Sequence, residues 1–216
     1  MVSEASFSLD CSTDSTPTVF IVDDDTGLCQ ALVYLLESVD LRCETYASTQ
    51  QFLDAYDPER PGCLVLDVRM PGMSGLDFQI ELAQRRSTLP IIMITGYADV
   101  SMAVRAMKAG AIEFLEKPFG DQVILESVQQ AIERDRQVRL VERERARFGS
   151  RLSTLTQRER QVMDLLVAGK SNKEIADELR VSRKTVETHR AKLMSKTDAK
   201  SLAGLIRSLL LYVERT

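Results

Sequence analysis

VLDVRMPGMSG, residues 65–75, is the segment from which the fold is best predicted. It begins as a short apolar run, reaches the carboxylate of Asp67 and then breaks at Pro71-Gly72. Proline and glycine end regular structure, so the run is typical of a buried strand that stops at Asp67. Burying an isolated carboxylate is costly, so Asp67 is either paired with another group or held out for chemistry.

Similar apolar runs recur on both sides of this strand and alternate with helical patterns. The predicted strands lie at 18–22, 42–46, 63–67, 91–94 and 112–115. The predicted helices lie at 27–39, about 48–56, 74–86 and 99–109, with another that begins near Asp121. Because strands and helices alternate, we predict an α/β domain over residues 18–135, built on a doubly wound five-stranded parallel sheet. Residues 1–17, rich in Ser, Thr and Asp, are expected to form a disordered tail.

The charge is divided unevenly along the chain, whose net charge is −4. Residues 1–121 carry 8 Lys and Arg against 19 Asp and Glu, a net charge of −11. Residues 122–216 carry 20 against 13, a net charge of +7. An acidic half joined to a basic half suggests one domain that handles a cation or a phosphate and one that binds a polyanion.

The composition argues against a membrane-spanning or disulfide-stabilised protein. No apolar run approaches the roughly 18 residues of a membrane span, and the N-terminus lacks the pattern of a signal peptide. The cysteines are widely spaced, and only one histidine could join them in a metal site, which argues against zinc and against a secreted framework. They are Cys11, Cys29, Cys43 and Cys63. We therefore expect reduced thiols in a cytoplasmic protein with no membrane partner.

The charged segment ERDRQVRLVERERARFGSR, residues 133–151, continues the fifth helix beyond the first domain. Salt bridges within the helix can stabilise it locally, so we predict a helical linker over 136–150 that Gly149-Ser150 closes. A short apolar seam on this helix could pair with a second chain, but it ends at Val141, so a helical linker is favoured over an independent coiled coil. The seam consists of Ala131, Val138 and Val141.

Residues 151–216 predict an all-α domain of four short helices. TQRE (156–159) and SNKE (171–174) are capping boxes, in which a hydroxyl and a glutamate satisfy the first backbone groups of a helix. Ser182 is the next N-cap, before a longer helix that runs to about Thr197. The last helix covers roughly 200–212.

Polar side chains stand at the ends of four predicted strands. They are Asp23-Asp24-Asp25, Asp67, Thr95 and Lys117. Because the carboxyl ends of parallel strands meet at one edge of a sheet, we expect these groups to lie together. Clustered carboxylates repel one another unless a cation neutralises them, and Mg²⁺ prefers such oxygen ligands. With an ammonium and a hydroxyl beside it, the cluster would form a pocket for a phosphoryl group.

The motifs at these strand ends closely resemble the receiver domain of bacterial two-component response regulators. They are VDDD (22–25), VLDVRMPGMSG (65–75), ITG (94–96) and FLEKPF (114–119). The resemblance implies a flavodoxin-like receiver fold in which Asp67 is the phosphoacceptor and attacks the phosphohistidine of a sensor histidine kinase. It also implies a metal site: Asp24 and Asp67 would bind Mg²⁺ directly, with the backbone carbonyl of Arg69 as a further ligand. Asp23 would support the ion, and Asp25 receives no role.

The same resemblance implies how a phosphoryl group would be held and sensed. Thr95 and Lys117 would hold its oxygens, and Phe114 would be the aromatic whose rotamer reports occupancy. Lys117-Pro118 would be a cis peptide bond. Phosphohydrolases of the haloacid-dehalogenase type share the strand-end aspartate and Mg²⁺, but they have a second aspartate two residues later as acid/base, where this sequence has Arg69. We therefore expect a persistent phosphoaspartate rather than an enzyme.

The basic half carries a second resemblance. Residues 155–196, LTQRERQVMDLLVAGKSNKEIADELRVSRKTVETHRAKLMSK, closely resemble the LuxR-type helix-turn-helix. With a receiver in front, the whole chain resembles regulators of the FixJ/NarL type. Residues 150–216 carry 14 basic and 8 acidic side chains, a net charge of +6 that suits a nucleic-acid partner.

The third helix of this half divides into two faces at 100° per residue. One face, which can pack on the other helices, holds Val186, Arg190, Leu193 and Thr197, with Arg190 at its border. The other is a polar ridge suited to a DNA major groove, and it holds Lys184, Glu187, Thr188, Ala191, Lys192 and Ser195. We predict phosphate contacts from Lys173, Arg183, Lys184, Arg190 and Lys192. Glu187 and Thr188 are predicted to read base edges, with Glu187 accepting from a cytosine amine, whereas His189 is expected to pack or to contact backbone.

These observations predict a phosphorylation-activated, sequence-specific DNA-binding transcription regulator with Mg²⁺ as its cofactor. Its expected partners are a sensor histidine kinase, double-stranded promoter DNA, RNA polymerase as a candidate, and a second copy of the chain when phosphorylated. The apolar last helix favours that self-association. The alternative is a Mg²⁺-dependent phosphorelay protein whose basic domain contacts only proteins. A small-molecule-sensing relative is disfavoured, because the N-terminal half is already accounted for as a receiver.

Overall fold

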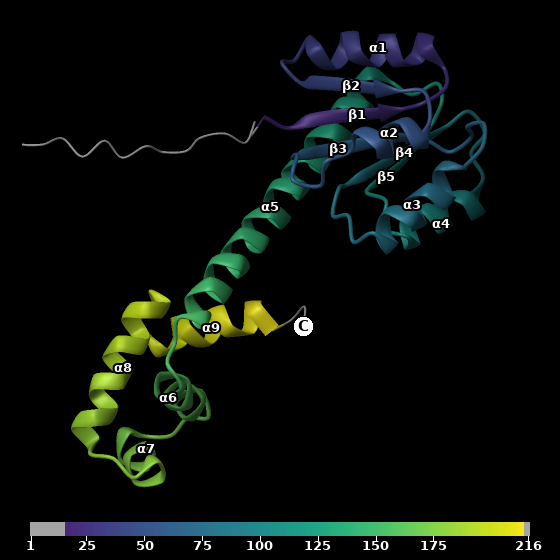
Figure 1. The fold of residues 1–216 in the computed structure, drawn as a ribbon. Helices are drawn as coiled ribbons and strands as arrows, with labels where there is room; N and C mark the ends of the chain where they lie inside the picture. Colours follow the sequence, from purple (N-terminus) through teal and green to yellow (C-terminus); the bar gives the residue numbers. More distant parts are fainter. Residues whose placement is uncertain (1–15, 214–216) are drawn as a thin grey trace, which may run out of the picture. The chain divides into compact units, whose positions relative to one another are not determined.

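The computed structural model describes residues 16–213, so most of the tail predicted over 1–17 lies outside the described residues. The chain forms two compact units that divide between Val138 and Arg139, inside the predicted linker. The first is an α/β unit and the second is helical (Figure 1). Among residues 16–213, no helix combines the length and the apolar character that a membrane span requires.

The first unit is built on a five-stranded sheet in the order β2-β1-β3-β4-β5, and every strand pair is parallel. Its strands are β1 Thr18–Val22, β2 Arg42–Tyr46, β3 Gly62–Asp67, β4 Ile91–Thr95 and β5 Glu113–Glu116. Its helices are α1 Thr26–Glu37, α2 Thr49–Ala55, α3 Gly75–Gln84 and α4 Val100–Lys108, followed by α5 Asp121–Ser153. The predicted doubly wound parallel fold is confirmed, and each strand lies within about one residue of its predicted place.

Helices cover both faces of this sheet, which explains why its central strands are apolar throughout. Successive residues of a strand point to opposite faces, so Val19 and Ile21 of β1 join one core while Phe20 and Val22 join the other. The first core is closed by apolar residues of α1 and α5, and the second by residues of α2, α3 and α4. Ala131 of α5 is fully buried in the first core. Ala131 is therefore not available to pair with a second chain, and any such seam on this helix excludes it.

Helix α5 continues without a break to Ser153. The prediction that Gly149-Ser150 closes this helix is wrong, and the surroundings of Gly149 supply the reason. A Cβ atom built at Gly149 would lie 2.8 Å from Cε2 of Tyr212, in the last helix. Gly149 therefore gives room to an aromatic ring and does not end the helix.

The second unit packs four further helices against the end of α5. They are α6 Gln157–Val167, α7 Asn172–Leu179, α8 Arg183–Thr197 and α9 Leu202–Val213. Both predicted capping boxes are present, at Thr156 and Ser171, and Ser182 caps α8 by accepting from the backbone of Thr185. The core of this unit gathers one or more buried side chains from each helix, including Phe148 of α5 and Leu205 of α9.

Candidate functional site

The carboxyl edge of the sheet brings together the polar residues that the sequence singled out. Val22 pairs with Leu66 in the register of β1 and β3, so Asp23 and Asp67 leave the sheet side by side. Lys117 follows β5 directly and reaches both of them. Its Nζ lies 2.6 Å from Oδ2 of Asp23 and 2.7 Å from Oδ1 of Asp67. Three residues that are far apart in the sequence thus form one charged cluster.

Both aspartates of this cluster are almost fully buried, with 2% of Asp23 and 3% of Asp67 exposed. Burial raises the pKa of the Asp67 carboxyl, and the hydrogen bond from Lys117 opposes that rise without cancelling it. Burial alone would lower the pKa of Lys117, but its hydrogen bonds to the two carboxylates outweigh that effect and raise it. Lys117 therefore stays charged and is the counterion of the buried pair.

The backbone fixes the orientation of these carboxylates. The N–H of Arg69 donates to Oδ2 of Asp67 at 2.7 Å, and the N–H of Asp25 donates to Oδ1 of Asp23 at 2.8 Å. Gly75, which begins α3, packs directly on the strand end, because a Cβ atom there would lie 2.1 Å from the backbone oxygen of Asp67. Only glycine allows this approach.

The acidic cluster fits a hard divalent cation. Asp23, Asp24 and Asp67 each offer a carboxylate oxygen, and these oxygens lie within 4.8 Å of one another. Asp24 is exposed, whereas the other two are buried, so an ion could be reached from solvent on the side of Asp24. A set of carboxylate oxygens is the kind of site that Mg²⁺ prefers. The role predicted for the Arg69 carbonyl stays a prediction.

Thr95 and Phe114 complete the predicted site but are turned to other partners in this structure. Thr95 is fully buried, and its hydroxyl donates to the backbone oxygen of Tyr97 at 3.3 Å. Phe114 is half-buried and packs against the core under α2, α3 and α4. The Lys117-Pro118 peptide bond is cis, as the resemblance implied.

Two features at the site were not expected from the sequence. The guanidinium of Arg69 lies over the ring of Tyr97, 4.8 Å from its centroid. Asp25, which had received no role, is the N-cap of α1 and accepts from the backbone of Gly27 and Leu28. Its signal was present in the sequence, since an aspartate just before a helical pattern is a typical N-cap.

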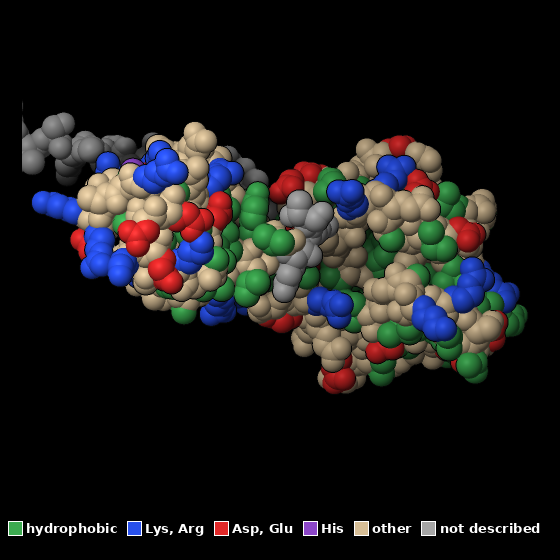
Figure 2. Space-filling view, turned by 90° about the horizontal axis from the view of Figure 1, so that it is seen from below, with side chains coloured by type: hydrophobic (Ala, Val, Ile, Leu, Met, Phe, Trp, Pro, Cys, Tyr) green, Lys and Arg blue, Asp and Glu red, His purple; other side chains and the backbone are tan. Residues whose placement is uncertain are grey.

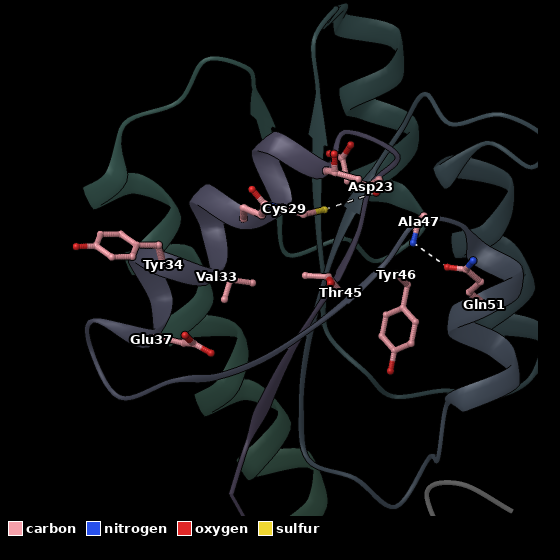
Figure 3. A pocket seen from close by; sticks show the side chains of 11 residues that line it. Asp23, Cys29, Val33, Tyr34, Glu37, Thr45, Tyr46, Ala47 and Gln51 are labelled. Atoms are coloured by element: carbon pink, nitrogen blue, oxygen red, sulfur yellow. Dashed lines mark hydrogen bonds between the residues drawn. The ribbon is translucent and has the colours of Figure 1, made fainter.

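A hollow of about 590 Å³ lies next to the cluster, between α1 and the connection from β2 to α2 (Figure 3). Val33, Tyr34 and Glu37 of α1 line one side of it and Tyr46, Ala47 and Gln51 the other, with Asp23 and Cys29 between them. The thiol of Cys29 contacts the backbone oxygen of Asp23 at 3.6 Å. Burial first, and then Asp23 and Asp25, raise the pKa of Cys29 to about 11, so the thiol stays protonated and unreactive.

In the helical unit, α8 presents the two faces that its sequence pattern predicts. Val186 and Leu193 are fully buried and Thr197 nearly so. The opposite ridge is exposed along its length, at Lys184, Glu187, Thr188, Ala191, Lys192 and Ser195. Lys and Arg side chains are spread over the face of this unit seen from below, with Asp and Glu side chains between them (Figure 2).

Two basic residues of α8 are engaged within the unit. Nη1 of Arg190 donates to Oδ1 of Asn172 at 3.2 Å, which ties α8 to α7. Nζ of Lys196 lies 2.7 Å from Oε2 of Glu159, which is only 2% exposed and also accepts from the backbone of Thr156. The hydrogen bond from Lys196, followed by that from Thr156, lowers the pKa of Glu159 to about 2.

Comparison with known proteins agrees with both units. Residues 19–129 match the response regulator receiver domain, and residues 153–209 match the bacterial regulatory proteins of the luxR family. The transcriptional regulatory protein FixJ of Azorhizobium caulinodans is 45% identical over 193 residues, covering 89% of this chain and 92% of that protein. The chain is a two-component response regulator.

Other relatives of this response regulator also match over most of the chain. Nodulation protein W of Bradyrhizobium diazoefficiens is 47% identical over 189 residues, covering 88% of this chain and 83% of that protein. The solved structure of the response regulator StyR is similar with a TM-score of 0.82 at 43% identity, covering 91% of this chain and 100% of that one. The response regulator is thus a transcriptional regulator that joins a receiver domain to a LuxR-type DNA-binding domain.

Proposed function

We propose that Asp67 of this response regulator accepts a phosphoryl group from the phosphohistidine of a sensor histidine kinase. The observation that supports this most is a buried carboxylate at a strand end with the Lys117 ammonium 2.7 Å away. The acid/base that a phosphohydrolase needs two residues later is absent, since Arg69 stands there. The product is therefore a lasting phosphoaspartate, and the protein is a switch and not an enzyme.

In the transfer, a carboxylate oxygen of Asp67 forms a bond to phosphorus as the bond from phosphorus to the donor nitrogen breaks. The imidazole leaves with that electron pair and takes a proton from water. Lys117 offsets charge on the phosphoryl oxygens, and the Thr95 hydroxyl turns from the Tyr97 carbonyl to donate to one of them. Asp24, Asp67 and the Arg69 carbonyl, with Asp23 in support, would hold Mg²⁺, which would supply the remaining positive charge when bound.

Phosphorylation then turns on specific binding to promoter DNA through α8. We assign phosphate contacts to basic side chains of α7 and α8, of which all but the half-buried Arg190 are exposed, and base contacts to the exposed ridge of α8. The phosphate-contacting residues are Lys173, Arg183, Lys184, Arg190 and Lys192, and the base-reading residues are Glu187 and Thr188. Arg190 makes its contact with the donors that Asn172 leaves free. Action on promoter DNA also implies a cytoplasmic protein, with RNA polymerase as a candidate partner.

A mobility-shift assay with the full chain at several salt concentrations tests this function. We expect specific complexes that tighten on treatment with a phosphodonor, with a steep salt dependence that reflects phosphate contacts. Failure to bind any DNA sequence in either state, together with phosphoryl transfer to a second protein, would favour the phosphorelay function instead.

We further propose that phosphorylation promotes pairing of two receivers through α4. Val100, Val104 and Met107 follow one another at helical spacing on this helix and are 82%, 44% and 46% exposed. When Thr95 moves toward the phosphoryl group, Phe114 gains room to turn inward, which reshapes this neighbouring face. A differential stabilisation of about 3 kcal/mol would raise a pairing-competent state from roughly 1% to more than half of the molecules.

Sedimentation of the full chain with Mg²⁺ and a phosphoryl mimic tests the pairing. Val104→Asp should lower the dimer fraction, whereas Val39→Asp, at a position that is 43% exposed on the first unit, serves as the matched control and should not. Equal dimerisation of both variants and the parent would show that α4 is not the pairing face.

A further inference from the structure

We propose that α8 reads its operator with hydrogen-bond acceptors and methyl groups alone at the centre of its ridge. The bases opposite Glu187 and Thr188 then carry an amino group, so they are cytosine or adenine and not guanine, and the base opposite Ala191 is thymine. The inference rests on the proposed function in one respect, the entry of α8 into the major groove of DNA.

Glu187 offers only acceptors. Its side chain is exposed, and no hydrogen bond or ion pair within residues 16–213 engages its carboxylate. In the major groove, cytosine presents the N4 amino group and adenine the N6 amino group, whereas guanine presents the acceptors N7 and O6. A carboxylate opposite guanine would leave acceptor facing acceptor, which a specific interface penalises.

Thr188 would ordinarily offer both a donor and an acceptor, but the structure removes the donor. Its hydroxyl donates to the backbone oxygen of Lys184 at 2.9 Å. With that hydrogen used inside the helix, Thr188 can present to a base only its oxygen lone pairs and its γ-methyl group. It therefore selects the same amino-bearing bases as Glu187.

Ala191 lies on the same exposed ridge, four residues after Glu187. At about 1.5 Å of rise per residue the two are about 6 Å apart along the helix, a distance close to two base-pair steps. A methyl group has no hydrogen bond to offer, and its favourable partner in the major groove is the C5-methyl group of thymine.

The donors that could read guanine lie away from this centre. Arg190 lies at the border of the packed face, where its Nη1 is bonded to Asn172, and Lys196 is bonded to Glu159 and to the backbone oxygen of Thr154. Lys184 and Lys192 stand four residues before and after Thr188, at the two ends of the central patch. Guanine is accordingly expected only outside the bases that the centre reads.

Selection of bound sequences from random DNA, with the phosphorylated full chain, identifies the operator. The selection is then repeated with Glu187→Gln, which gains a hydrogen-bond donor. The position whose base preference changes is the one opposite residue 187. Adenine should be favoured there, because glutamine pairs with adenine by two hydrogen bonds. Thr188→Val keeps the shape but removes the acceptor, so its amino-bearing base should lose roughly 5- to 150-fold of its preference. Thr188→Ser keeps the acceptor and should keep that preference.

Uracil in place of thymine tests Ala191 with no change to the protein. Removal of the base methyl should weaken binding of the parent chain about fourfold, because burial of one such carbon group contributes about 0.8 kcal/mol. The same replacement should have no effect on binding by Ala191→Gly. Each variant is compared with itself, so its ratio of affinities for thymine and uracil DNA does not depend on its stability. Lys173→Gln is the control, because a lost phosphate contact weakens all sequences alike.

The outcomes separate this inference from the proposed function. Guanine opposite Glu187 or Thr188 in the selected operator overturns the acceptor-only inference, although DNA binding stands. The same holds if Thr188→Val shows the same base preference as the parent. An equal loss on uracil in the parent and in Ala191→Gly overturns the role of Ala191. If no sequence is enriched and salt does not affect retention, the DNA-binding function itself fails.

Discussion

Replacing Gly75 by alanine should damage both the stability and the phosphorylation of the receiver. The added Cβ would lie 2.1 Å from the backbone oxygen of Asp67, and real Cβ contacts are essentially never shorter than 3.0 Å. The start of α3 and the end of β3 must therefore separate by about 0.9 Å or more. Because both partners are backbone, we expect a loss of about 1–3 kcal/mol in the free energy of unfolding, as for an overpacked core. A shift of about 1 Å in a reacting group can cost about 100-fold in rate.

Two measurements on the full chain check this expectation. Guanidinium unfolding followed by tyrosine fluorescence reports on the receiver, which holds Tyr34, Tyr46, Tyr56 and Tyr97 of the chain's five tyrosines. Labelling by a small phosphodonor with Mg²⁺ gives the rate. Gly120→Ala is the matched control, since its Cβ would meet only Val123, at 4.0 Å, and both measurements should match the parent. Parent-like stability and labelling of Gly75→Ala would refute the close approach.

Three further perturbations give distinct readouts. Asp67→Asn should abolish labelling by a phosphodonor while thermal unfolding stays cooperative, and labelling at a rate near that of the parent would exclude Asp67 as the acceptor. Glu159 has a folded pKa of about 2, below its unfolded value of about 4.3, so its stabilising effect is complete above pH 5 and is lost as the pH falls toward 2. The free energy of unfolding of the parent should therefore fall more steeply between pH 5 and pH 2 than that of Glu159→Gln. Parallel curves would contradict the pairing with Lys196. Lys192→Ala should weaken binding to all DNA and reduce the salt slope by about 0.9, whereas a changed sequence preference would show that Lys192 faces a base.

Much of the fold was predictable because local signals agree with it. The buried strands are continuous apolar runs, and both capping boxes and the Ser182 cap begin helices where the sequence indicates. The acidic site was predictable for a different reason. In a parallel sheet the topology alone brings Asp23, Asp67 and Lys117 to one edge, so spacing along the chain is no obstacle.

What the sequence did not predict depends on contacts between distant segments. Glycine is typical of helix ends, but Gly149 lies inside a helix because its small size makes room for Tyr212, 63 residues later. Ala131 has the spacing of an exposed seam, yet the sheet buries it. Glu159 was recognised as a capping residue, but its bond to Lys196 becomes visible only once α6 and α8 are packed together. Pattern and propensity contain no information about such pairs.

The order of strands in the sheet also has a consequence for synthesis of the chain. β1 is made first but lies inside the sheet, between β2 and β3, so neither of its edges can pair before residue 42 has been translated. The face of the sheet that carries Val19 and Ile21 stays uncovered for longer, because Ile124 and Val128 of α5 help to cover it and are translated much later. At bacterial translation speeds that delay is on the order of ten seconds, during which apolar strands are exposed to misassembly. The helix that finally seals the receiver core is the one that begins the next unit, so a nascent chain stalled before α5 should be the species most in need of a chaperone.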